Sequence, residues 1–171
     1  MTRPFKNLAC RSVVALFALA SAAPALAEVE GATGRSIVLN SLNVTNTQDL
    51  DFGDLSSGAT TGRATVDANT DALTTTGGVT PLGGTPNAAV FYAVGTLNRV
   101  FIVQIPNGSI TLTNGSGGTM TVSNWTSNGP VNRNLGPTGV AIIRVGGRLN
   151  VGANQASGTY SGTFSVTVVY P

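Results

Sequence analysis

The chain has 171 residues, 42% of them hydrophobic and only 9% charged, and a formal net charge of +2. This length predicts one domain that is large enough to bury a core. The sequence contains no histidine, which excludes a Ser-His-Asp triad and an imidazole zinc site.

The first 27 residues have the pattern of a secretory signal peptide. A basic start precedes an apolar run over residues 13–20 and the small-residue ending Ala25-Leu26-Ala27. This pattern predicts export from the cytoplasm and cleavage before Glu28. The apolar run has about half of the roughly 20 residues that a membrane-spanning helix needs. We therefore expect a protein of the periplasm or the cell surface, without a transmembrane segment after cleavage.

Removal of this leader also removes the only cysteine, Cys10, and the only lysine, Lys6. Residues 28–171 contain six arginines and seven acidic residues. The basic pI of the whole chain therefore comes from the leader and indicates nothing about nucleic-acid binding. Cys-His and Ser-Lys nucleophiles cannot be built from residues 28–171 either. We expect a non-enzymatic protein with no cofactor, no metal and no nucleic-acid partner.

The charges are divided along the sequence. All acidic residues precede residue 72, and four of the six arginines follow it. This division either arises by chance or gives neighbouring subunits complementary ends.

Residues 28–35 are polar and predict a flexible N-terminal tail, and residues 36–171 predict a single β-domain. Glycine pairs and Asn-Gly steps separate short apolar runs, a pattern typical of an antiparallel β-sandwich or barrel. The runs, each a predicted strand, are 37–44, 50–55, 64–67, 72–79, 89–94, 100–105, 110–113, 120–125, 140–145, 149–151 and 160–170.

Two of the turn signals predict particular hairpins. Asn107-Gly108 and Asn114-Gly115 bracket a run of five residues, which predicts a three-stranded meander over residues 100–125. Gly146-Gly147 separates the runs 140–145 and 149–151, which predicts a tight hairpin with glycines at positive φ.

The last run has the clearest pattern of the chain. Its large apolar residues share one parity, which predicts a strand with one buried face at the C-terminal edge of the fold. Such an edge either closes a sandwich or pairs with another chain. These residues are Tyr160, Phe164, Val166, Val168 and Tyr170.

Three other features are candidate sites. Asp49 and Asp51, with Asp54 nearby, form either the solvated side of a strand or a carboxylate pair for glycoside chemistry. Residues 67–71 (DANTD) match the first ligands of a calcium loop but lack its glycine and its final glutamate, so they predict a surface turn or a weak calcium site. Trp125 either caps the core or faces outward as a platform for stacking sugars.

A family resemblance completes the sequence evidence. Residues 145–170 (VGGRLNVGANQASGTYSGTFSVTVVY) closely resemble the closing signature of a bacterial secreted family, the domain-of-unknown-function family numbered four-four-zero-two. The segments 50–53, 64–66, 89–91 and 105–107 look like its earlier landmarks, in the same order. The resemblance implies an immunoglobulin-like β-sandwich over roughly residues 36–171, found in Gram-negative bacteria, with no established activity.

The ending is also similar to that of chaperone-usher pilins and spore-coat U type proteins. Those pilins have an alternating last strand, a penultimate tyrosine, here Tyr170, and a glycine about fourteen residues from the end, here Gly158. Their cysteine pair is absent. The resemblance implies that Gly158 and the closing strand form an assembly surface, with copies of this chain, related subunits or a periplasmic chaperone as partners.

Two functions fit these observations. The first is a pilin-like fimbrial or coat subunit that works through β-strand pairing, in which residues 37–44 of a neighbour pair beside the closing strand. The alternative is an adhesin or carbohydrate-binding module that uses loops near Trp125 and Asn128-Gly129.

Overall fold

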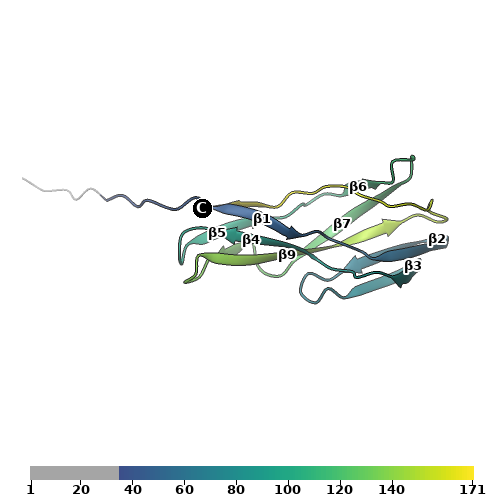
Figure 1. Ribbon diagram of the computed structural model, residues 1–171, viewed down its shortest axis with the longest axis horizontal. Coiled ribbons are helices and arrows are strands. Elements are labelled where there is room, and N and C mark those ends of the chain that lie inside the picture. Colours follow the sequence, from purple (N-terminus) through teal and green to yellow (C-terminus); the bar gives the residue numbers. More distant parts are fainter. Residues whose placement is uncertain (1–34) are drawn as a thin grey trace, which may run out of the picture. The chain divides into compact units, whose positions relative to one another are not determined.

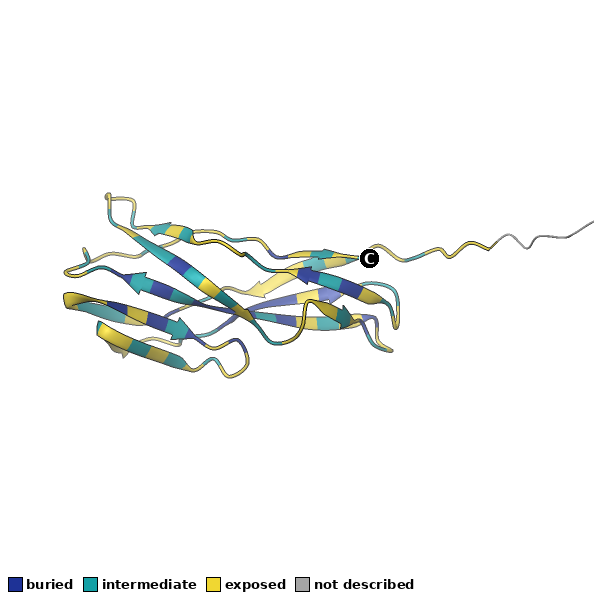
Figure 2. Ribbon diagram, turned by 180° about the vertical axis from the view of Figure 1, so that it is seen from behind, coloured by how far each residue is buried: buried dark blue, intermediate teal, exposed yellow. Residues whose placement is uncertain are grey.

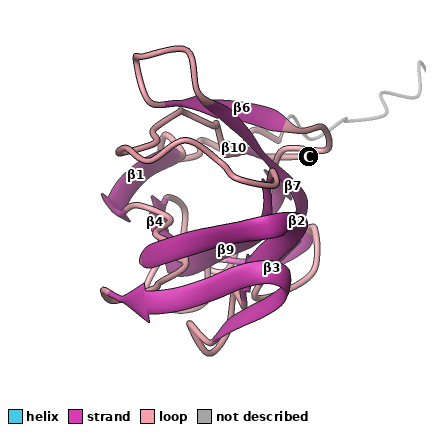
Figure 3. Ribbon diagram, turned by 90° about the vertical axis from the view of Figure 1, so that its right-hand side faces the viewer, coloured by secondary structure: helices cyan, strands magenta, loops and turns pink. Residues whose placement is uncertain are grey.

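The computed structural model describes residues 35–171, and residues 37–171 form one compact unit. The signal peptide and the N-terminal tail up to residue 34 lie outside the described residues and stay predictions. The described part of the chain is built of strands and loops (Figure 3). Its strands are β1 (Asn43–Gln48), β2 (Asp54–Val66), β3 (Leu73–Gly83), β4 (Ala89–Val94), β5 (Val100–Gln104), β6 (Ile110–Thr113), β7 (Thr119–Ser127), β8 (Asn132–Asn134), β9 (Val140–Val151) and β10 (Thr167–Val169).

The strands form two antiparallel sheets, which confirms the predicted all-β sandwich (Figure 1). The seven-stranded sheet has the order β1-β4-β9-β2-β3, and β7 pairs with β9 and with β6. The three-stranded sheet has the order β10-β5-β8. Strand β9 is central because β7 pairs with it on one side, while β4 and β2 pair with successive halves of it on the other.

The core consists of two clusters, and β9 contributes to both. Figure 2 shows how buried and exposed positions are distributed along the strands. Ile143 and Val145 belong to the first cluster, which also contains side chains of β4 and β5. Leu149 and Val151 belong to the second, which contains side chains of β2, β3 and β7. Every second residue of β9 therefore packs inward, as the period of two requires.

The hairpin predicted at Gly146-Gly147 is wrong, because both glycines lie inside the continuous strand β9. Neither of them has a positive φ. Their role is to make room: a Cβ on Gly147 would lie 3.2 Å from Cε3 of Trp125, and one on Gly146 would collide with the carbonyl oxygen of Val66. Likewise, Gly77-Gly78 lies within β3, where the glycines admit the backbone of β2.

The predicted meander is right only in its second half. β6 and β7 form a hairpin with Ile110 opposite Val122, and Gly115 in its loop has a φ of 73°. β5 instead pairs with β10 and β8 in the other sheet. Neither Asn107 nor Gly108 has a positive φ, so this Asn-Gly step does not make the tight turn of a two-residue hairpin. The chain uses it to cross between the sheets.

The first predicted strand, residues 37–44, overlaps the observed β1 only at residues 43 and 44. β1 begins at Asn43, and residues 37–42 precede it outside any strand. The backbone N–H of Asn40 donates to Oγ1 of Thr96 at 2.7 Å. Ile37 and Val38 remain 66% and 92% exposed. Leu42, at the end of this segment, packs against the first core cluster, whereas Ile37 and Val38 take no part in the core.

Candidate assembly edge

The C-terminal strand, defined as residues 159–171, keeps the predicted parity from Phe164 onward, whereas Tyr160 belongs to neither core cluster. Phe164, Val166, Val168 and Tyr170 pack against the first core cluster, and the residues between them are exposed. The ring of Phe164 meets that of Phe91 edge-on at 6.1 Å and that of Trp125 at 4.7 Å. The side chains of this strand thus complete the core of the chain's own domain.

Both ends of this strand are fixed by tyrosine hydroxyl groups. At one end the hydroxyl of Tyr170 accepts a hydrogen bond of 2.6 Å from the backbone N–H of Thr96. At the other the hydroxyl of Tyr160 donates to the carbonyl of Ala156 and accepts from Nε2 of Gln155, both at 2.7 Å. Gly158 has a φ of 146°, and a Cβ there would lie 3.2 Å from Asn114. The two tyrosines and Gly158 therefore hold the strand in place.

The ladder of this strand is shorter than its apolar pattern predicts. Ser161 exchanges two backbone hydrogen bonds with Thr113, of 2.9 and 3.0 Å, and the three residues of β10 pair with β5. Between these anchors, residues 162–166 run beside the loop that joins β5 and β6, where a hollow of about 820 Å³ lies. The chain crosses between sheets in this loop, so it offers no continuous strand as a partner.

Within residues 35–171, one side of this strand's backbone makes no hydrogen bond, although β10 lies close to β1. Within an antiparallel ladder a residue directs its N–H and C=O to the same side, and successive residues alternate. Ser161 directs both groups to β6, so the opposite parity points away from β5 and β6. β10 is an edge of its sheet. In the described part of the chain no hydrogen bond involves the backbone groups of the residues on this open side, which are Gly162, Phe164, Val166 and Val168.

Trp125 lies between the two core clusters and packs against both. Its indole is partly buried against Phe164 and close to Gly147, and its Nε1–H donates to the carbonyl of Gly108 at 2.7 Å. This is the environment expected of a residue that caps the core. The ligand platform stays a prediction.

The acidic candidates are exposed or occupied in local structure. Asp49, Asp51 and Asp54 are all exposed, as expected for a solvated side. No group of three potential metal ligands occurs among residues 35–171. Oδ1 of Asp67 accepts hydrogen bonds from the N–H groups of Asn69 and Thr70, both at 2.9 Å. These bonds hold the pKa of Asp67 below its usual value, first through Asn69 and then through Thr70.

Two of the arginines stabilise the sandwich from within the chain. Arg144 pairs with Asp71, so at least one acid and one arginine from the two halves of the sequence meet inside the same molecule. Arg133 is partly buried, which lowers its pKa, and its guanidinium donates to Oδ1 of Asn128 at 2.8 Å and to the carbonyl of Pro130 at 2.9 Å. It thereby ties β8 to the loop after β7.

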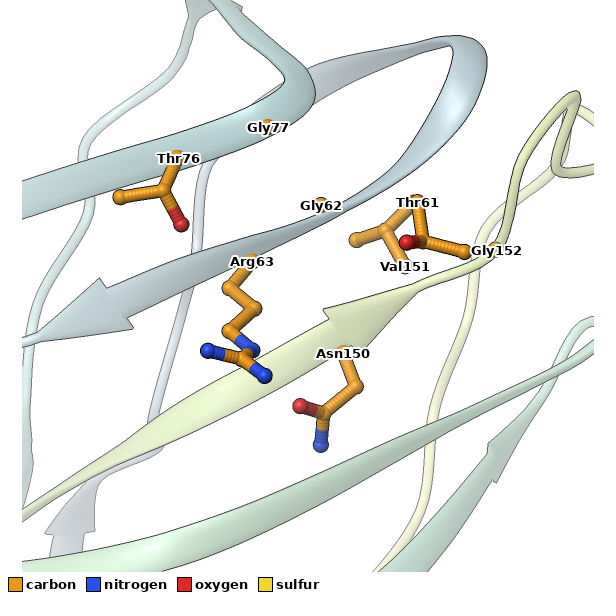
Figure 4. A pocket seen from close by; sticks show the side chains of 8 residues that line it. All are labelled: Thr61, Gly62, Arg63, Thr76, Gly77, Asn150, Val151 and Gly152. Atoms are coloured by element: carbon orange, nitrogen blue, oxygen red, sulfur yellow. The ribbon is translucent and has the colours of Figure 1, made fainter.

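Sequence reasoning missed a second hollow, of about 490 Å³, on the seven-stranded sheet. Arg63 of β2 and Asn150 of β9 are directly opposite each other and line it, together with Thr76 of β3 (Figure 4). The available signal was strand parity. Arg63 and Asn150 both fall on the outward parity of their strands, and the residues beside them on the inward parity, such as Ala64 and Leu149, are apolar.

The fold defines this chain as an antiparallel β-sandwich protein with an open edge along its last strand. A family model described as "Domain of unknown function (DUF4402)" matches residues 42–170, and the chain belongs to this family. Searches of curated proteins and of solved structures found no significant match. No helix in residues 35–171 is long and apolar enough to cross a membrane.

Proposed function

We propose that this protein is a secreted structural subunit, pilin-like or coat-like, that assembles at the cell surface or in the periplasm by β-strand pairing between chains. The single observation that supports this proposal most is the open side of the C-terminal strand. A row of unpaired N–H and C=O groups is a template for another strand. Natural proteins commonly protect such an edge with charges, and this strand has none.

The incoming strand comes from residues 37–42 of a neighbouring copy, because Asn43 and Val44 already pair with β4 in their own chain. This segment supports the proposal because residues 37–42 lie outside any strand, and Ile37 and Val38 leave their apolar side chains exposed. Phe164 and Val166 of the chain itself already pack in the first cluster. The neighbour therefore adds a strand at a finished edge and does not replace a missing one.

The test is the molar mass of residues 28–171, expressed without a chaperone and measured by light scattering over a range of concentrations. We expect a chain that unfolds in one cooperative transition and forms oligomers as its concentration rises. A strict monomer at every concentration would favour the alternative, a binding module. Insoluble chain would indicate that the sandwich needs a strand from a partner to fold.

Two neighbouring proline variants locate the edge. Val168→Pro removes an N–H on the open side and breaks no hydrogen bond, so we expect loss of the oligomers, with only the fall in Tm that follows from trimming the Val168 side chain on the first core cluster. Val169→Pro removes an N–H on the side of β5, so we expect a loss of about 1 kcal/mol or more of stability, because a ladder hydrogen bond is broken. Oligomers of Val168→Pro that match those of the wild type would rule out this edge.

A further inference from the structure

The outward face of four neighbouring strands, β3, β2, β9 and β7, carries two cross-strand rows of polar side chains, and neither row contains an acidic residue. Residues directly opposite each other on a sheet project to the same face. The inward parity of the same strands is apolar, with Ala64, Leu149 and Val122 in the second core cluster. The rows are Thr76, Arg63, Asn150 and Thr121, and Thr74, Thr65, Arg148 and Ser123.

The two arginines of this face are diagonal neighbours, because Arg63 is opposite Asn150 and Arg148 lies two residues before Asn150. Such neighbours are about 7–8 Å apart between their Cα atoms, so two positively charged side chains start from adjacent positions of this face. The only ion pair in residues 35–171 joins Arg144 to Asp71. Nε of Arg148 is buried and has no hydrogen-bond partner. The face therefore holds two positive charges that the described chain does not neutralise.

The carboxylate of Asp67, which follows this face along β2, does not form an ion pair with either arginine. Asp67 comes two residues after Thr65, but its Oδ1 accepts bonds from the N–H groups of Asn69 and Thr70 and from the hydroxyl of Thr70. The guanidinium groups of Arg63 and Arg148 can therefore pair with an oxyanion from outside the chain. Guanidinium groups bind such anions with two parallel hydrogen bonds.

The neighbours of the arginines indicate what carries the anion. Nδ2 of Asn150 donates to Oγ of Ser123 at 3.0 Å and to the carbonyl and Oγ1 of Thr121, each at 3.2 Å. The amide is thus held on the side of β7, which leaves its Oδ1 as an acceptor beside the hollow that Arg63 and Thr76 line (Figure 4). Threonine hydroxyl groups both donate and accept, so the face is matched to a chain of hydroxyl groups.

From this combination we infer that the face binds an acidic polysaccharide, with Arg63 and Arg148 contacting its carboxylates and Asn150 and the surrounding threonines contacting its hydroxyl groups. The open face of a sheet suits an extended polymer, and the hollow at Arg63 takes one charged sugar unit. This site is separate from the C-terminal strand and does not rest on the assembly proposed above.

The test measures binding of residues 28–171 to polygalacturonate by isothermal titration calorimetry at low salt, with neutral dextran as the matched polymer. We expect binding to polygalacturonate and none to dextran. Arg63→Gln and Arg148→Gln should each weaken binding about tenfold or more, the loss expected for a charge-assisted hydrogen-bonded contact. Arg63 is exposed, so Arg63→Gln tests the site even where Arg148→Gln lowers the Tm.

Arg99→Gln is the matched control, because it removes the same charge from the loop between β4 and β5. Unchanged binding by Arg99→Gln supports a defined site, whereas an equal loss would show that only net charge matters and would overturn the proposal. Wild-type binding by Arg63→Gln would overturn it as well. A polyphosphate that binds more tightly than polygalacturonate would replace the saccharide by a phosphate polymer, which also overturns the inference.

Discussion

Strand β9 and the C-terminal strand both place alternate apolar residues in the core, yet their backbones differ. β9 pairs with β7 on one side and with β4 and β2 on the other. The C-terminal strand pairs at Ser161 and over β10, and its other side is open. The comparison shows that side-chain packing and backbone pairing are separable. The first decides where a strand lies, and the second decides whether it can accept a partner.

The largest effect should come from a charge on the inward parity of the C-terminal strand. Phe164→Asp removes a ring packed on Phe91 and Trp125 and buries an unpaired carboxylate. Loss of the ring alone costs roughly 3–5 kcal/mol in a core, a large part of a typical domain's 5–15 kcal/mol. We expect little soluble protein. The control Ser165→Asp lies on the exposed parity, and an equal loss of yield there would contradict the packing role of Phe164.

The next largest effect should come from a proline in β9. Asn150 is opposite Arg63 on one side and Thr121 on the other, so Asn150→Pro removes a ladder hydrogen bond and leaves an acceptor unpaired. We expect a loss of about 2–4 kcal/mol, measured by urea unfolding. If Asn150→Pro proved as mild as Val168→Pro, the contrast between the paired strand and the open one would fail.

A smaller effect should come from filling the space at the centre of β9. Gly146→Ala places a methyl group against the carbonyl oxygen of Val66 and 2.8 Å from the N–H nitrogen of Ala68. Overpacking of this kind costs about 1–3 kcal/mol. Gly108→Ala is the control, since a Cβ there meets nothing within 4 Å. The fall in Tm should be confined to the Gly146 variant.

The smallest effect concerns pH and the turn between β2 and β3. The pKa of Asp67 is lowered in the fold by the N–H groups of Asn69 and Thr70, so its contribution to stability is present above the unfolded pKa, near 3.8, and is lost as pH falls through the folded pKa. Wild-type protein should therefore lose slightly more stability in acid than Asp67→Asn. NMR titration of the Asp67 carboxyl provides the check. In Thr70→Val the hydroxyl bond to Asp67 is missing, so the carboxyl should titrate at a higher pH than in the wild type.

Much of the fold could be predicted from parity and turn residues. The alternation of Phe164, Val166 and Val168 correctly predicted a face in the core, and the runs 89–94 and 110–113 are strands with the predicted bounds. Glycine was the main source of error. A glycine permits a turn, but it also permits close approach, and at Gly146-Gly147 the tertiary neighbours Trp125 and Val66 decide between the two.

Of the two candidate sites, one could be predicted from the sequence and the other could not. The C-terminal strand could be found from sequence because its residues are adjacent in the chain. The pair Arg63 and Arg148 could not, because the two residues are neighbours only through the pairing of β2 with β9. A sequence pattern reports parity within one strand and does not report which strand lies beside it.

The sequence by itself determined the all-β class, the family and the inward face of the last strand, because these depend on local periodicity and on motifs that are continuous in the chain. Only the tertiary structure decided that β9 runs unbroken between two core clusters, that β5 leaves the expected meander, and that the last strand is paired near its ends and open along one side. The physical reason is that hydrogen bonds between strands join residues far apart in sequence. Whether an N–H group has a partner is therefore a property of the assembled sheet.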